Sequence, residues 1–107
     1  FMQTITSKRE FSEVYSQGRR VNHKLARMTI LSVDETISSR IAFVAPKRLG
    51  NAVFRNRCKR VLREAVSLCH FPQNGLLVII FATRTTHKSH PHEVACALTS
   101  LLAKAGF

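Results

Sequence analysis

A dense cluster of cations lies between residues 47 and 64 of this 107-residue chain. Seven of these eighteen residues are Lys or Arg, and one is Glu. Cations without acids to pair with repel one another in the free protein, so such a run is typical of a surface that binds a polyanion. Arginine suits phosphate especially, because its planar guanidinium group donates two parallel hydrogen bonds. The run therefore predicts a nucleic-acid-binding surface.

A helix over residues 52–68 would sort these residues by side. At about 100° per residue, the polar side chains fall within about 140° of the circumference: Arg55, Asn56, Lys59, Arg60 and Arg63. The apolar residues gather opposite: Cys58, Val61, Leu62, Ala65 and Cys69. An ordinary solvated face is the alternative, but such faces mix charge signs, and no acid lies between the first and last of these cations. The pattern predicts a helix that packs on its apolar side and presents cations outward.

Other residue types in the chain give little sign of chemistry. His92 and Cys96 lie one helical turn apart, a spacing found in zinc sites. No paired cysteines accompany them, and His90 with Pro91 fits the start of a helix instead, so we predict no bound metal. The acids form no paired-carboxylate motif, and neither a Ser-His-Asp arrangement nor a phosphate-binding glycine loop is present. We predict no catalytic side chain.

The overall charge supports the same interpretation. Seventeen Lys and Arg against six Asp and Glu give a net charge of +11, as in many nucleic-acid-binding proteins. A basic membrane-surface protein is the alternative, but no basic amphipathic terminal segment is present, and the longest apolar run, residues 76–82, is too short to span a bilayer. The three cysteines lack paired spacing and no signal peptide is visible, which predicts reduced thiols in the cytoplasm.

Local signals outline one α+β domain. Ser7 and Glu10 form a capping box that starts a helix at Lys8, and Gly18 ends it. Strands are expected over 21–33, a segment long enough to hold an extra strand, and over 39–45. A basic loop, the helix at 52–68, a strand at 76–82 and a helix from Pro91 follow. We predict a single RNA-binding domain over residues 1–107, with a small two-layer αββαβα arrangement around one central sheet.

Residues 47–64 read K-R-L-G-N-A-V-F-R-N-R-C-K-R-V-L-R-E. This run resembles the signature that the bacterial ribonuclease P protein subunit carries on its central helix. The spacing of Phe11, Tyr15 and Gly18 resembles the first helix of that family. The apolar strand at 76–82, followed by Thr83 and Arg84, resembles a later strand. The similarity extends over essentially the whole chain, and the central run is its specific part.

The resemblance implies the protein component of an endoribonuclease whose RNA subunit removes the 5′ leader of precursor tRNA in tRNA maturation. It implies that the catalytic RNA is bound by a loop and helix: Lys47, Arg48, Asn51, Arg55, Asn56, Arg57, Lys59, Arg60 and Arg63. Mg²⁺ is the implied cofactor, bound mainly by the RNA. No membrane or DNA partner is expected. The resemblance also implies a left-handed strand–helix–strand crossover, and that part of a basic N-terminal tail is absent from this sequence.

The resemblance further implies a cleft between the first helix and the sheet that holds the single-stranded leader. The candidate residues are Phe11, Tyr15, Arg27 and Thr29. An aromatic ring stacks on any base, as a generic leader requires. Phe11 could equally fill the core, whereas the hydroxyl of Tyr15 favours an exposed position. Many family members have Tyr at the position of Thr29 and Ser at that of Pro46, so we expect a less aromatic cleft floor here.

Two other classes of protein fit a basic helix. One is a structural or ribosomal RNA-binding protein without a role in processing. The other is a DNA-binding regulator that uses residues 52–68 as a recognition helix. The match of the central run to the ribonuclease P signature disfavours both.

Overall fold

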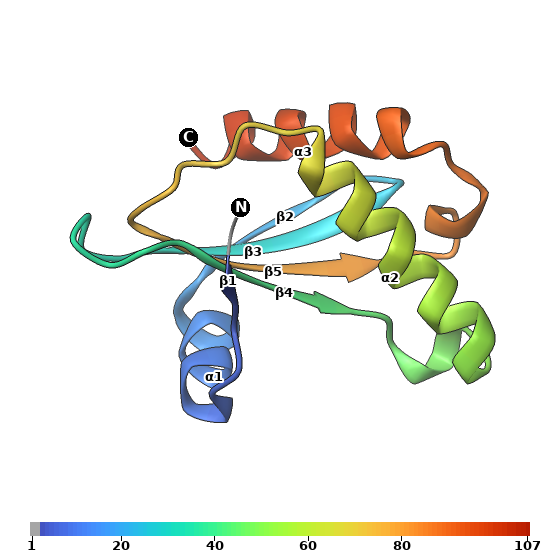
Figure 1. The fold of residues 1–107 in the computed structure, drawn as a ribbon, viewed down its shortest axis with the longest axis horizontal. Coiled ribbons are helices and arrows are strands. Elements are labelled where there is room, and N and C mark those ends of the chain that lie inside the picture. The colour runs from blue at the N-terminus through green and yellow to red at the C-terminus, as the bar shows by residue number, and fades with distance from the viewer. Residues whose placement is uncertain (1–2) are drawn as a thin grey trace.

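A five-stranded mixed sheet organises residues 3–107, which are the residues that the structure, a computed structural model, describes (Figure 1). The sheet order is β1-β4-β5-β3-β2. The strands are β1 (Gln3–Thr4), β2 (Arg19–Asn22), β3 (Ala26–Ser32), β4 (Arg40–Val44) and β5 (Leu76–Ala82). The helices are α1 (Lys8–Gln17), α2 (Ala52–Ser67) and α3 (Pro91–Lys104), with short 3-10 turns η1 (Lys47–Leu49) and η2 (Thr86–Lys88).

The central strand β5 is apolar along its whole length because both of its faces are covered. It pairs parallel with β4 and antiparallel with β3. Val78 and Ile80 point into a core shared with α2 and α3, which includes Leu62 and Leu98. Ile79 points to the other face and packs with Val14 of α1. A strand covered on both faces reads as a continuous hydrophobic run rather than an alternating one.

The helices lie on both faces of the sheet. Figure 1 shows α2 and α3 above it and α1 below, over one end only. The predicted α+β class and single central sheet are confirmed. α1 adds a partial third layer to the two layers that the sequence suggested, and it leaves part of its face of the sheet uncovered.

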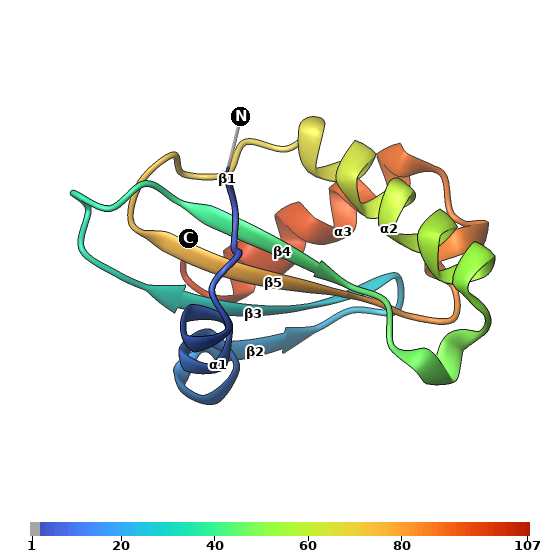
Figure 2. The same cartoon turned by 60° about the horizontal axis from the view of Figure 1, so that its bottom comes forward.

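The connection from β4 through α2 to β5 is left-handed. The two strands are parallel neighbours. Seen from the side of α1 with both strands pointing right, β5 lies below β4 and α2 lies on the far face (Figure 2). Nearly all such connections are right-handed. The crossover implied by the family resemblance is therefore found here.

Most predicted boundaries agree with the observed ones. Ser7 caps α1 by accepting a hydrogen bond from the Glu10 N–H at 3.3 Å. The segment expected to hold an extra strand contains both β2 and β3, although β2 begins at Arg19. The two-residue strand β1, which pairs with β4, was not predicted. Within residues 3–107, no helix has the length and apolar character needed to cross a membrane.

Gly18 allows α1 and β3 to approach closely. A Cβ atom at this position would lie 2.5 Å from the Val14 carbonyl oxygen and 2.7 Å from Cγ2 of Thr29. Real Cβ atoms do not make such contacts, so the glycine serves for more than ending the helix. It lets the chain pass directly from α1 into β2, beside the uncovered part of the sheet.

Candidate RNA-binding surface and leader cleft

The first turn of α2 is fixed by two of the predicted RNA-binding residues. Asn51 is the N-cap, and its Oδ1 accepts a hydrogen bond from the Phe54 N–H at 3.0 Å. Arg55 donates from Nε to the Ala45 carbonyl oxygen at 2.9 Å. This bond ties the helix to the chain just after β4. Both residues therefore have a structural task, and their contact with RNA stays a prediction.

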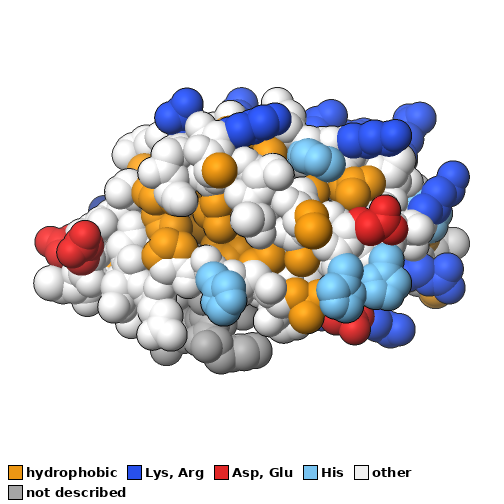
Figure 3. All heavy atoms as spheres, turned by 90° about the horizontal axis from the view of Figure 1, so that it is seen from above, with side chains coloured by type: hydrophobic (Ala, Val, Ile, Leu, Met, Phe, Trp, Pro, Cys, Tyr) orange, Lys and Arg blue, Asp and Glu red, His pale blue; other side chains and the backbone are white. Residues whose placement is uncertain are grey.

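The middle of α2 presents the predicted cationic face. Asn56, Arg57, Arg60 and Arg63 are exposed and Lys59 is half-buried, whereas Cys58, Leu62 and Ala65 on the other side are buried. The ion pairs found among residues 3–107, Arg9–Glu13 and Arg40–Glu10, involve none of these cations. Seen from the side of α2 and α3, Lys and Arg side chains lie mainly around the rim of the molecule (Figure 3). The positive charge on α2 is available to a polyanion.

A second short element braces the start of α2. The His87 ring of η2 packs edge-on against Phe54, with 4.4 Å between ring centroids. η2 is in turn held by Thr86, a fully buried residue whose hydroxyl donates to the Leu25 carbonyl oxygen at 2.7 Å. Thr83 and Thr85 donate to the Lys24 carbonyl oxygen in the same way. Sequence reasoning missed this brace, although the threonines at 83, 85 and 86 were a signal for it.

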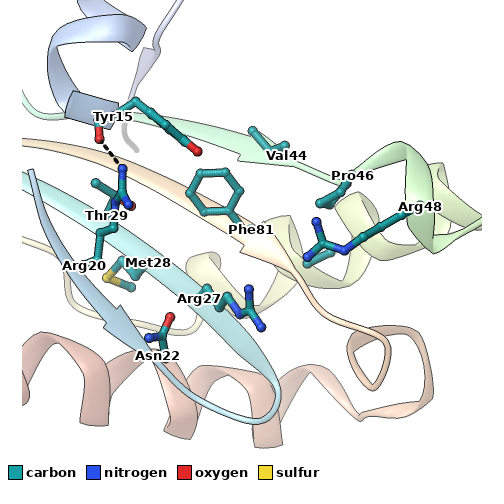
Figure 4. A pocket seen from close by; sticks show the side chains of 11 residues that line it. Tyr15, Arg20, Asn22, Arg27, Met28, Thr29, Val44, Pro46, Arg48 and Phe81 are labelled. Atoms are coloured by element: carbon teal, nitrogen blue, oxygen red, sulfur yellow. Dashed lines mark hydrogen bonds between the residues drawn. The ribbon is translucent and has the colours of Figure 1, made fainter.

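A cleft of about 380 Å³ lies on the other face of the sheet, where α1 leaves it uncovered (Figure 4). Its lining comes from α1, β2, β3, β4, β5 and the segment before α2. Three of the four predicted leader-binding residues line it: Tyr15, Arg27 and Thr29. Arg48, predicted for the surface formed by α2, lines this cleft as well. The lining is completed by Arg20, Asn22, Met28, Val44, Pro46, Phe81 and Ala82.

Two aromatic rings and one guanidinium group form the wall of the cleft near α1. Tyr15 is 47% exposed and meets Phe81 edge to face, with ring centroids 6.2 Å apart. The Arg20 guanidinium lies 4.9 Å from the Tyr15 ring centroid and donates from Nη2 to the Tyr15 carbonyl oxygen at 3.1 Å. Figure 4 shows the Tyr15 and Phe81 rings next to each other. Phe81 supplies the aromatic floor that the sequence led us not to expect.

Phe11 lies behind the cleft rather than in its lining. It is half-buried and packs against the core under α1, which contains Val14 and Ile79. Its ring is nearly parallel to that of Tyr15, at 6.4 Å between centroids and 14° between planes. Of the two interpretations left open for Phe11, the geometry favours the core. The residue supports Tyr15 and does not face the cleft.

The histidines and cysteines have structural surroundings. His90 is the N-cap of α3, and its Nδ1 accepts from the His92 N–H at 3.1 Å, while Glu93 completes a capping box. Among residues 3–107, no group of three or more His, Cys, Asp and Glu side chains could hold a metal ion. Burial raises the pKa of the Cys58 thiol and of the Cys69 thiol above the usual range. Raised thiol pKa values are the opposite of what a nucleophile requires.

Comparison with known proteins agrees with this geometry. A model of the Ribonuclease P family matches residues 2–106. The chain belongs to the ribonuclease P protein family. The Ribonuclease P protein component of Symbiobacterium thermophilum is 34% identical over 104 residues, covering 95% of this chain and 90% of that protein. The component from Gluconacetobacter diazotrophicus has the same identity and coverage. The role predicted from the sequence, in tRNA 5′ processing, is confirmed through the family.

Solved structures of ribonuclease P proteins share the fold. The Staphylococcus aureus RNase P protein superposes with a TM-score of 0.75 at 24% identity, covering 98% of this chain and 96% of that one. The Thermotoga maritima RNase P protein gives a TM-score of 0.74 at 17% identity, covering 95% and 96%. At these identities the likeness speaks for the fold. The predicted residue roles rest on the contacts described above.

Proposed function

We propose that this ribonuclease P protein binds the catalytic RNA through α2 and holds the 5′ leader of precursor tRNA in the cleft beside α1. It thereby assists endonucleolytic removal of the leader, while the RNA subunit performs the hydrolysis. The observation that carries the proposal is the pair of surfaces on opposite faces of one sheet. One is a helix whose cations form no ion pair within residues 3–107, and the other is an aromatic cleft rimmed by arginines.

The RNA-binding surface consists of the outward side chains of α2 and the loop before it. Arg57, Arg60 and Lys47 are exposed and can donate charge-assisted hydrogen bonds to phosphate oxygens. Asn56 is neutral and can hydrogen-bond phosphate, sugar or bound water. Asn51 caps the first turn of α2, and the Arg55 hydrogen bond to Ala45 ties that turn to the chain after β4. A helix fixed in this way meets a structured RNA without first being ordered.

The cleft fits a short single strand. The exposed part of the Tyr15 ring offers a stacking surface, and Phe81 holds that ring from the side. Arg20, Arg27 and Arg48 surround the opening and can neutralise leader phosphates. The stacking and phosphate contacts proposed here tolerate any sequence, as a generic leader requires. Such a site raises the affinity for precursor tRNA over mature tRNA.

We assign Mg²⁺ to the RNA rather than to the protein. Residues 3–107 provide no cluster of oxygen ligands for this ion, and the six acids are dispersed along the chain. The cations of α2 would lower the Mg²⁺ requirement by screening repulsion between RNA phosphates. The chain would act in the cytoplasm, where precursor tRNA is processed. No DNA or membrane partner is part of the proposal.

Precursor-tRNA cleavage by a bacterial ribonuclease P RNA at low Mg²⁺ tests the proposal. The RNA alone is expected to be nearly inactive, and added protein is expected to restore site-specific cleavage of the leader. A structural RNA-binding protein would bind the RNA without restoring cleavage. Failure to restore cleavage, with binding intact, would favour that alternative over ours.

A further inference from the structure

A second groove lies on the α2 side of the sheet, away from the leader cleft. Its volume is about 460 Å³, and it lies between β4, which the short strand β1 covers only in part, and the C-terminal half of α2. Phe43, Phe71 and Val66 form its apolar walls. Gln73 and His70 are among its polar lining residues. The functions proposed above leave this groove unused.

The wall formed by Phe43 is arranged for a flat, electron-rich ligand. The Arg63 guanidinium lies 5.8 Å from the centroid of the Phe43 ring. A phenyl face and a guanidinium plane are both surfaces on which nucleobases stack. Arg63 is exposed on the predicted cationic face of α2, and this contact shows that it also lines the groove beside Phe43. The Arg63 guanidinium covers the Phe43 ring in this structure, but the side chain is exposed and can move aside. An inserted base could then stack on Phe43 while its phosphate meets Arg63.

The backbone of β4 adds hydrogen-bonding groups at the same place. The Ile5 N–H donates to the Ile41 carbonyl oxygen at 2.9 Å, so the backbone groups of Ile41 point toward β1. By strand alternation, those of Phe43 point toward the same edge. β1 pairs only with Arg40 and Ile41, so no described strand covers Phe43 there. An N–H and a C=O at an open edge suit the polar edge of a base.

The charge around the groove favours RNA over a protein segment or a lipid. The lining has no acidic residue. Its first residue on α2 is Arg63, which lies one helical turn after Lys59 on the cationic face. The groove is therefore continuous with the surface that we assign to the catalytic RNA. Structured RNAs present unpaired bases from loops and bulges, which proteins bind by stacking.

We propose that this groove accepts one unpaired nucleobase of the catalytic RNA, stacked on Phe43 and held at its phosphate by Arg63. The proposal rests on the assignment of α2 to RNA binding. It adds a contact with one particular base, because phosphate contacts alone do not distinguish one part of the RNA from another. The groove would set the position of the protein along the RNA.

The test compares Phe43→Leu with Phe43→Tyr in the full chain. Leucine keeps the apolar packing of the half-buried residue and removes the ring, whereas tyrosine keeps the ring. Affinity for the ribonuclease P RNA is measured by filter binding over a range of salt concentrations. Phe43→Leu is expected to weaken binding by about 5- to 150-fold, the loss that corresponds to about 1–3 kcal/mol for one stacked base. Its salt dependence should equal that of the parent chain, since no phosphate contact is lost.

Base-specific chemical probing of the RNA supplies the second measurement. With the parent chain and with Phe43→Tyr, one unpaired base should become protected, and with Phe43→Leu that base should become reactive again. Phe107→Ala, which removes an exposed aromatic ring far along the chain, is the matched control and should leave both readouts unchanged. Thermal melting of each variant reports on folding.

The outcomes separate this proposal from the one on which it rests. If Phe43→Leu is folded and binds RNA like the parent chain while Arg60→Ala binds weakly, the groove holds no base but α2 still binds RNA. If Arg60→Ala also binds normally, the assignment of α2 fails and the groove loses its argument with it. If Phe43→Leu abolishes self-association of the protein and leaves RNA binding intact, the occupant is a second copy of the chain and our proposal is overturned.

Discussion

Replacement of Tyr15 with alanine should separate leader binding from assembly with the RNA. The Tyr15 ring lies at the cleft wall. Its centroid is 6.2 Å from that of the Phe81 ring and 4.9 Å from the Arg20 guanidinium, and 47% of the residue is exposed. It belongs to α1, on the face of the sheet opposite α2. Its loss therefore removes part of the cleft without touching the cationic helix.

The expected loss in precursor affinity follows from these contacts. A base stacked on one ring is worth about 1–3 kcal/mol, which is about 5- to 150-fold in the dissociation constant. Arg20 also loses the ring beneath it, a contact worth about 0.5–1 kcal/mol at an exposed site. Because the ring is only half covered, the cost to folding should stay near about 1 kcal/mol. The variant should be folded and defective in one function.

The assay is the affinity of the assembled holoenzyme for precursor tRNA with a leader of several nucleotides and for mature tRNA. Tyr15→Ala should weaken only the first. Tyr15→Phe keeps the ring and should match the parent chain, because the Tyr15 hydroxyl makes no hydrogen bond among residues 3–107 and the Arg20 bond goes to the Tyr15 backbone. Equal loss for both tRNAs by a folded Tyr15→Ala holoenzyme would refute the leader cleft. α2 would then remain as the only supported RNA contact.

Further predictions concern the helix, the sheet contact and the thiols. Arg57→Ala combined with Arg60→Ala should weaken RNA binding without lowering the melting temperature. For the parent chain, the logarithm of the RNA-binding constant should fall with the logarithm of the salt concentration with a slope of roughly −4 to −6, if about five to seven phosphates are neutralised. Gly18→Ala should lower the free energy of unfolding in urea by about 1–3 kcal/mol, because its Cβ would strike backbone 2.5 Å away. Native protein should react with an alkylating reagent at exposed Cys96 and not at Cys58. Burial raises the pKa of the Cys58 thiol in the folded protein above its value in the unfolded chain. The stabilisation from the buried, protonated thiol is therefore complete below the ordinary thiol pKa and decreases as the pH rises from there toward the raised pKa, which urea titrations at increasing alkaline pH would detect.

Elements with strong local signals were predictable from the sequence. The capping box at Ser7 and Glu10, the apolar run of β5 and the 3.6-residue period of α2 each act within a few neighbouring residues. The strand β1 was missed because two residues have no periodicity, and only pairing with β4 makes them a strand. The left-handed crossover was implied by family resemblance alone, since general chain-packing rules favour the opposite hand.

The candidate site was predicted only in outline, because local sequence signals show which residues share a helix face and not which distant residues they contact. Helical spacing showed which cations share a face, but it could not show that Arg63 would meet Phe43 or that Arg55 would reach the Ala45 carbonyl. Arg48 was assigned to the helix surface because it is adjacent in sequence, yet η1 brings it into the leader cleft. Phe81 was placed within the apolar strand at 76–82, and the sequence did not show that its ring would face the leader cleft. Each of these arrangements depends on tertiary packing, which the spacing of residues within one helix or strand does not show.

The side chains of β4 alternate between the two faces of the sheet, so this one strand contributes to the leader cleft, to the packing under α2 and to the second groove. Ala42 packs under α1 and Val44 reaches the leader cleft, whereas Ile41 and Phe43 face α2 and the second groove. Just beyond the strand, the Ala45 carbonyl holds Arg55, which ties the first turn of the cationic helix to the chain after β4. Side chains on either face can thus change independently, while the backbone that carries them is common to all. If the leader and the catalytic RNA bind as we propose, the distance between them is set by a few residues of one strand.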